Sequence, residues 1–280
     1  MRIDAHQHFW QPARGDYDWM PQDIAVLNRP YGPTDLAPAL AAEGIAGTVL
    51  VQAAASVAET HYMLGLADAT PSVLGVVGWV DFEAEDHRKV MQTFAAHPKF
   101  RGLRPMIQDI EDVDWMLRDD VQWAFDEMIE MDLTFDALGF PRHLDNFHKL
   151  LTRYPDLRVV IDHCMKPQIR EQMAGQDAFT EWAAGMTRLA RDTRACVKLS
   201  ALVTEASPEW TSEDIRPFAH HVLEVFGADR VMWGSDWPVC RVRAEYGAWF
   251  GVAQSLCAHL SSVDQAEVFG GTARRFYRLP

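Results

Sequence analysis

Eight short apolar runs, spread over the whole chain, constrain the fold of this sequence more than any other feature. Most are nearly continuous, as in VVGWV at 76–80 and RVVID at 158–162. Strands buried on both faces of a parallel sheet show such runs, whereas strands with one wet face alternate apolar and polar residues. We therefore predict eight parallel strands. The runs span residues 3–9, 47–54, 73–81, 100–107, 133–140, 157–165, 195–202 and 230–238.

The segments between these runs carry helical spacing. Within 112–130, apolar residues recur at steps of three and four, with acidic residues between them. Thr34 and Gly44 bound another such segment, in the positions that an N-cap and the glycine after a helix end occupy. Strand and helix therefore alternate along the chain. The predicted helices cover 34–44, 59–69, 84–96, 112–130, 142–153, 177–192, 212–226, 242–260 and 262–277.

Eight such units in 280 residues match an α/β fold of one kind, a single (β/α)8 TIM barrel. An open doubly wound sheet carries fewer strands and, where it binds a dinucleotide, a glycine-rich turn after the first strand. Here the first run is followed by QPARGDYDW at 11–19, which lacks that turn. Because no linker, repeat or low-complexity run divides the chain, we expect residues 1–280 to form one domain.

Charge and cysteine content disfavour several classes of protein. Lys and Arg number 26 against 40 Asp and Glu, and the net charge of −14 repels phosphate backbones and anionic lipid heads. We therefore expect no nucleic-acid partner and no membrane association. Four cysteines without CxxC spacing favour reduced thiols, and the chain shows neither a signal peptide nor a run of about 18 apolar residues. We expect a soluble, cytoplasmic protein, and a homo-oligomer is compatible with these features.

Titratable residues follow three of the predicted strands at the ends where barrel enzymes carry their chemistry. His6 and His8 alternate on the first strand, so both imidazoles face one side. His163 and Asp236 follow the sixth and eighth runs. Taken singly, each has an ordinary reading, such as a core histidine or an Asx turn. Together, three nitrogens and one oxygen suit a single zinc-like ion with one position left for water.

Such an arrangement predicts hydrolysis. A bound ion lowers the pKa of its water towards about 7. Asp236 could then accept the water proton as a general base.

Five motifs carry a resemblance to a known family over nearly the whole chain. They are IDAHQHFW at 3–10, VVIDHCMKP at 159–167, VKLSALVTEA at 197–206, WGSDWPVC at 233–240 and VFGGTARRFYRL at 268–279. The sequence resembles the amidohydrolase superfamily, and within it the sugar-lactonase branch of L-fuconolactonases and L-rhamnonolactonases. The resemblance implies His6, His8 and His163 around the reaction centre, with Asp236 as the general base. It also implies one divalent metal ion, zinc, although some members of this branch work without an ion.

Polar residues at other strand ends are candidates for binding the substrate. Asp136 stands out because an ionisable group inside an apolar strand is costly to bury unless it is paired or faces a polar cavity. A dicarboxylate would need several unopposed cations, whereas the cations here are interspersed with carboxylates, which favours a neutral, hydroxylated lactone. The candidates are Gln52, Trp79, Arg104, Asp136, Lys198 and Glu205, and the cations near the expected mouth are Arg104, Lys166, Lys198 and Arg241.

The leading hypothesis is therefore an enzyme that opens a sugar-acid lactone of the L-fucono, L-rhamnono or galactono type. His163 and Asp236 would be its catalytic residues. A zinc-dependent decarboxylase of the same superfamily, acting on an unsaturated or aromatic carboxylic acid, is the alternative reaction. A barrel that binds a small ligand without turnover is the third reading.

Overall fold

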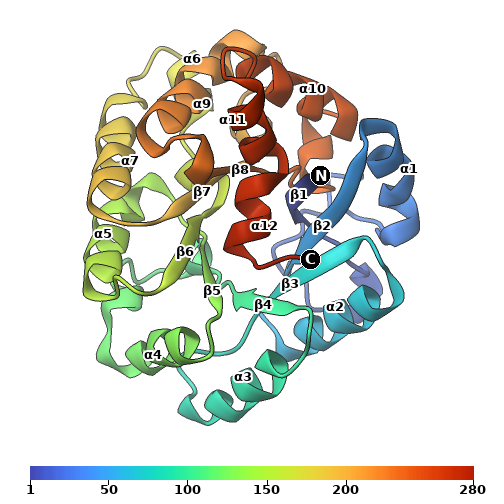
Figure 1. The fold of residues 1–280 in the computed structure, drawn as a ribbon, viewed down its shortest axis with the longest axis vertical. Helices are drawn as coiled ribbons and strands as arrows, with labels where there is room; N and C mark the ends of the chain where they lie inside the picture. The colour runs from blue at the N-terminus through green and yellow to red at the C-terminus, as the bar shows by residue number, and fades with distance from the viewer.

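A computed structural model describes residues 1–280. Its eight strands lie side by side in chain order, and every neighbouring pair is parallel. Figure 1 shows them around the middle of the molecule with the long helices outside. The prediction of a single (β/α)8 barrel is confirmed. The strands are β1 (Arg2–Gln7), β2 (Ile45–Val51), β3 (Val73–Gly78), β4 (Phe100–Leu103), β5 (Thr134–Ala137), β6 (Arg158–Ile161), β7 (Cys196–Leu199) and β8 (Val231–Trp233).

The barrel closes at a short segment just beyond β8. There, pairing with β1 continues at an isolated parallel bridge between Gln7 and Trp237. The His8 amide donates a hydrogen bond to the Trp237 carbonyl at 2.7 Å, and the Asp236 amide donates to the His6 carbonyl at 2.8 Å. This seam therefore brings the histidines of the first strand beside the aspartate that follows the last one.

The longer helices pack on the barrel because each buries residues at helical spacing. In α5, for example, Leu144, Phe147, Leu150 and Leu151 are all buried. These helices are α1 (Pro33–Glu43), α2 (Val57–Ala69), α3 (Arg88–Ala95), α4 (Gln122–Glu130), α5 (Leu144–Arg153), α7 (Thr180–Asp192), α9 (Ser212–Phe226) and α10 (Tyr246–Leu256). The shorter ones are α6 (Ile169–Met173), α8 (Leu202–Glu205), α11 (Ser262–Ala266) and α12 (Thr272–Phe276).

The helix predicted over 112–130 is wrong in its first half. Only α4, which begins at Gln122, is α-helical, and the stretch 115–121 holds two 3-10 turns. Asn146 of α5 reaches this region and donates a hydrogen bond to the Val113 carbonyl at 2.8 Å. The backbone of this stretch makes the tighter bonds of 3-10 turns, such as that from the Leu117 amide to the Asp114 carbonyl at 2.8 Å, in place of α-helical ones.

The helix predicted over 262–277 is likewise divided. A wider turn over 267–271 separates α11 from α12. Gly270 in this turn lies so close to the first residue that a Cβ there would collide with the Met1 carbonyl oxygen. Close approach of the chain start thus interrupts the helix.

The inside of the barrel forms an apolar core of its own, separate from the larger core between the strands and the outer helices. The last residues of the chain, Tyr277 and Leu279, pack into this inner core. In Figure 1, α12 lies across the middle of the strand ring. The chain end therefore covers one end of the barrel. None of the helices has the length and apolar character that crossing a lipid bilayer requires.

Candidate functional site

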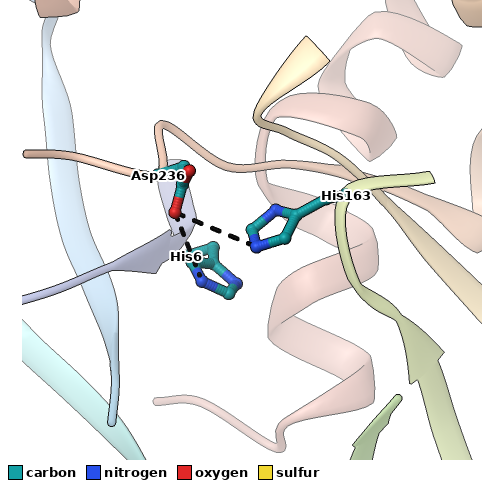
Figure 2. A group of neighbouring side chains, drawn as sticks. All are labelled: His6, His163 and Asp236. Carbon is teal, nitrogen blue, oxygen red and sulfur yellow. Dashed lines mark ion pairs between the residues drawn. The ribbon is translucent and has the colours of Figure 1, made fainter. Parts of the chain in front are cut away.

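The four residues predicted to form the reaction centre converge at the carboxyl ends of the strands. His6 lies in β1 and His8 just after it, while His163 follows β6 and Asp236 follows β8. All four side chains are buried. Figure 2 shows His6 and His163 turned toward the carboxylate of Asp236. The expected gathering of an N-terminal histidine pair and a late aspartate is therefore present.

The distances within this cluster suit a single small ion. Asp236 Oδ1 lies 3.7 Å from His6 Nε2 and 3.9 Å from His163 Nε2. One potential ligand atom from each of these three residues lies within 4.8 Å of the other two. His8 Nε2 lies 3.1 Å from His6 Nε2 and 3.2 Å from Asp236 Oδ1, although His8 is outside that group of three.

Hydrogen bonds behind the imidazoles orient two of them for metal binding. His8 Nδ1 lies 2.7 Å from the Val51 carbonyl oxygen, so this nitrogen carries the proton and Nε2 keeps its lone pair. His163 Nδ1 lies 2.8 Å from the Ser200 hydroxyl, which leaves Nε2 toward Asp236. The two rings therefore present their Nε2 atoms to the same small volume.

The electrostatics of the cluster favour neutral imidazoles beside an ionised carboxylate. Burial lowers the pKa of His163 to about 3. Burial and the charge of Lys198 lower the pKa of His6 well below its usual value. Burial alone would raise the pKa of Asp236, but His163 and His8 hold it below its ordinary range. Imidazole nitrogens and one carboxylate form a donor set that Zn²⁺ prefers, so the residues fit such an ion.

Two backbone features place His163 and Asp236. Both have positive φ angles, 54° and 55°, a region that L-residues seldom adopt. Gly234, two residues before Asp236, packs directly on β1, where a Cβ would lie 2.7 Å from the Cβ of His6. A glycine is therefore required where the end of β8 meets the first histidine.

A cavity with a volume of about 490 Å³, its open mouth included, lies over the cluster. One part of its wall is apolar and the other part is polar, an arrangement that suits a ligand with both characters. The apolar residues are Trp19, Ala53, Met106, Leu138 and Val239, and the polar residues are His8, Arg104, Gln108, His163, Lys166 and Asp236.

Of the six predicted substrate-binding residues, the structure brings Arg104 to the lining of this cavity. Arg104 is tied to its surroundings, since Nη1 donates to Asp162 Oδ2 at 3.3 Å and Nη2 donates to the Gln52 carbonyl. Gln52 is fully buried, and its side chain donates to the Arg104 carbonyl at 2.7 Å. Trp79 and Glu205 are not part of the lining.

Lys198 and Asp136 form a buried charged network beneath His6. Lys198 Nζ lies 3.0 Å from His6 Nδ1, 2.5 Å from Asp136 Oδ2 and 2.9 Å from Asp162 Oδ1. The Tyr277 hydroxyl donates to Asp136 Oδ2 at 2.7 Å. Burial raises the pKa of Asp136 to about 6, whereas Asp162, for which burial acts in the same direction, is held well below its usual pKa by Lys198 and His6. This network supports His6 from the side away from the cavity.

Trp19 is a cavity residue that the pattern of strand ends did not indicate. It lies in the loop between β1 and α1, and its indole nitrogen donates to the Ala53 carbonyl at 2.5 Å. The available signal was its position in a loop that follows a strand at the catalytic end of the barrel. Its distance along the chain from the histidines obscured that signal.

Comparisons with known proteins agree over the full length. A family model described as amidohydrolase matches residues 3–279. An L-fucono-1,5-lactonase of Burkholderia ambifaria is 43% identical over 99% of this chain and 96% of its own length. An L-fucono-1,5-lactonase of Burkholderia multivorans is 34% identical over 100% and 97% of the two chains. A zinc-bound crystal structure of an amidohydrolase from Burkholderia multivorans has a TM-score of 0.94 at 33% identity and covers 100% of both chains.

Proposed function

Because this chain belongs to the amidohydrolase family, we propose that it is a hydrolase that opens the lactone ring of a sugar acid. The two L-fucono-1,5-lactonases support this proposal, since their likeness to this chain covers nearly its whole length. The observation that carries it is the convergence of His6, His163 and Asp236 beneath an open cavity. The decarboxylase alternative receives less support, because both of these curated relatives are lactonases.

Asp236 is the proposed general base. Its contacts with the three histidines all involve Oδ1, so Oδ2 can accept a proton from a water molecule in the cavity. Its lowered pKa keeps the carboxylate ionised at neutral pH. The water oxygen attacks the lactone carbonyl carbon, and the tetrahedral intermediate collapses as the bond to the ring oxygen breaks. Asp236 then returns its proton to that ring oxygen.

The cluster fits one divalent metal ion, for which we propose zinc. His6, His8, His163 and Asp236 would hold it, and the zinc-bound relative supports this choice. When bound, the ion would lower the pKa of a water molecule and polarise the lactone carbonyl. His163 also faces Asp236 Oδ1 and, as the second catalytic residue, would keep this carboxylate turned toward the cavity.

The remaining polar residues divide into two proposed roles. Arg104 lines the cavity, so we place it against the substrate. Gln52, Asp136 and Lys198 would hold Arg104 and His6 in position from beneath. Because Arg104 and Lys198 are already paired with buried carboxylates, the site lacks the several unopposed cations that a dicarboxylate needs. This charge balance favours a neutral, hydroxylated lactone as substrate.

A panel of L-fucono-, L-rhamnono- and galactonolactones tests the function, with proton release followed above the spontaneous background. The wild-type protein should hydrolyse at least one of them, and Asp236→Asn should lower that rate by roughly 10²- to 10⁴-fold, as loss of a general base does. The surface variant Asp156→Asn is the matched control and should behave as wild type.

Two outcomes of this experiment separate the function from the mechanism. Release of carbon dioxide from an unsaturated acid, without lactone hydrolysis, would favour the decarboxylase. Lactone hydrolysis that Asp236→Asn leaves unchanged would reject only the role of this carboxylate.

A further inference from the structure

The cavity contains one basic side chain that makes no direct ion pair with a carboxylate. Of its two basic side chains, Arg104 is bound to Asp162 and to the Gln52 carbonyl. Lys166 Nζ has no hydrogen-bond acceptor and no carboxylate within 4.0 Å, and it lies 5.5 Å from the centroid of the Phe140 ring. The ammonium group of Lys166 is therefore free to meet a ligand.

The backbone that presents Lys166 adopts a disfavoured conformation. Residues 163–166 all have φ angles between 46° and 59°, and none of the four is glycine. L-residues rarely adopt this region even singly, and such conformations persist where the surrounding structure enforces them, often at functional sites. The Trp182 indole donates to the Cys164 carbonyl at 2.8 Å, and the Lys166 amide donates to the His163 carbonyl at 2.8 Å. This left-handed turn directs both His163 and Lys166 to the cavity.

The proposed reaction creates negative charge in this cavity from a neutral molecule. Attack of water on the lactone carbonyl moves an electron pair onto the carbonyl oxygen, and collapse of the intermediate breaks the bond to the ring oxygen. The proton that Asp236 took from water goes to the ring oxygen, and the new acid loses its proton to solvent. A cation without a protein partner interacts more strongly with these charged species than with the neutral lactone, which is the condition for catalysis.

We propose that Lys166 is a catalytic residue whose ammonium group donates a hydrogen bond to the lactone carbonyl oxygen as charge develops there, and then holds the carboxylate of the product. This role rests on the proposed lactonase function.

The variants Lys166→Met and Lys166→Arg test this role, with Lys89→Met on the exposed face of α3 as the matched control. Methionine keeps an unbranched side chain, one heavy atom shorter than that of lysine, and makes no new demand on the backbone. For Lys166→Met, we expect kcat to fall by roughly 100-fold or more, as on loss of an oxyanion donor, while KM changes less than threefold. Lys166→Arg should recover part of kcat, and Lys89→Met should match wild type.

Binding of the reaction product gives a second measurement, which does not require the variant to turn over substrate. The sugar acid should bind at least tenfold more weakly to Lys166→Met than to wild type in a calorimetric titration. The corresponding sugar alcohol, which is neutral, should bind both proteins equally. A purely structural role for Lys166 would weaken the binding of both compounds and lower the melting temperature.

The outcomes keep the two proposals apart. If wild type hydrolyses lactones while Lys166→Met retains kcat and product affinity within threefold, the role of Lys166 is wrong and the lactonase function stands. If wild type binds the sugar acid through Lys166 but opens no lactone, the lactonase function is wrong and the anion site stands. If wild type does neither, both proposals are wrong.

Discussion

Lys198 shows how a single buried charge holds the site together. It contacts Asp136, Asp162 and His6, and its side chain has no exposed surface. Removing one partner from such a group is costly because the remaining charges stay buried without compensation. The network therefore links the stability of the barrel interior to the orientation of the first histidine.

We expect Lys198→Met to lower the free energy of unfolding by about 3–5 kcal/mol, because Asp136 and Asp162 lose their shared cation. Urea denaturation measures this loss. The control Tyr277→Phe removes only one hydrogen bond to Asp136 and should cost about 1 kcal/mol. Adding Asp136→Asn to Lys198→Met should restore part of the stability, since one of the two uncompensated charges is then gone. A Lys198→Met protein as stable as wild type would contradict this view of the network.

At the scale of the elements, α2 holds the loop between β1 and α1, which contributes Trp19 to the wall of the cavity. The hydroxyl of Tyr17 in this loop donates to Glu59 Oε2 at 2.8 Å, and the Ala53 amide donates to Oε1 at 3.2 Å. Burial raises the pKa of Glu59 from 4.5 to about 7. The folded protein therefore holds a proton on this carboxyl more tightly than the unfolded chain does.

The burial of Glu59 predicts a pH dependence of stability with a definite sign. The contribution of the Glu59 proton to folding is complete below pH 4.5 and is lost as the pH rises through about 7. The stability of wild type relative to Glu59→Gln should thus fall by about 3 kcal/mol over this interval, since each pKa unit corresponds to about 1.4 kcal/mol. Urea denaturation of both proteins at four pH values from 4.5 to 8 measures the difference. A difference that stays constant or grows with pH would contradict the raised pKa of Glu59.

The elements also show which features the sequence could predict. All eight strands overlap the apolar runs and six lie wholly within them, because burial on both faces leaves a continuous signal. The helix predicted over 112–130 is wrong in its first half, where two 3-10 turns form and Asn146, distant in the chain, donates to the Val113 carbonyl. Such a contact has no local signature.

The same distinction applies to the site. His6 and His8, at the end of β1, met Asp236 as expected, because barrel closure makes the first and last strands neighbours. Asp136 and Lys198 lie within β5 and β7 rather than after them, so their side chains lie below the cavity. The residue type predicted a polar contact in both cases. The depth along each strand depends on where the strand ends, which the sequence leaves open by several residues.

For the whole molecule, the chain end determines how well the barrel interior is shielded. Tyr277 is fully buried and Leu279 nearly so, and both pack against the inner core. Deleting residues 277–280 should lower the free energy of unfolding by at least about 3–5 kcal/mol, the cost of losing one large buried side chain. Thermal and urea denaturation measure this effect.

Deleting Pro280 alone is the control for this truncation. Pro280 is exposed, so its loss should change the free energy of unfolding by less than about 0.5 kcal/mol. A truncated protein that unfolds at the wild-type temperature would show that the inner core does not depend on this cover.

The seam between β1 and the segment after β8 links the closure of the barrel to the integrity of the reaction centre. The two backbone hydrogen bonds that complete the ring, from the amides of His8 and Asp236, belong to residues of the reaction centre itself. Any motion that separates β1 from the segment after β8 must therefore also move His6 and His8 away from Asp236. On gentle heating, we expect enzymatic activity to be lost when this seam opens, at a lower temperature than the loss of helical content.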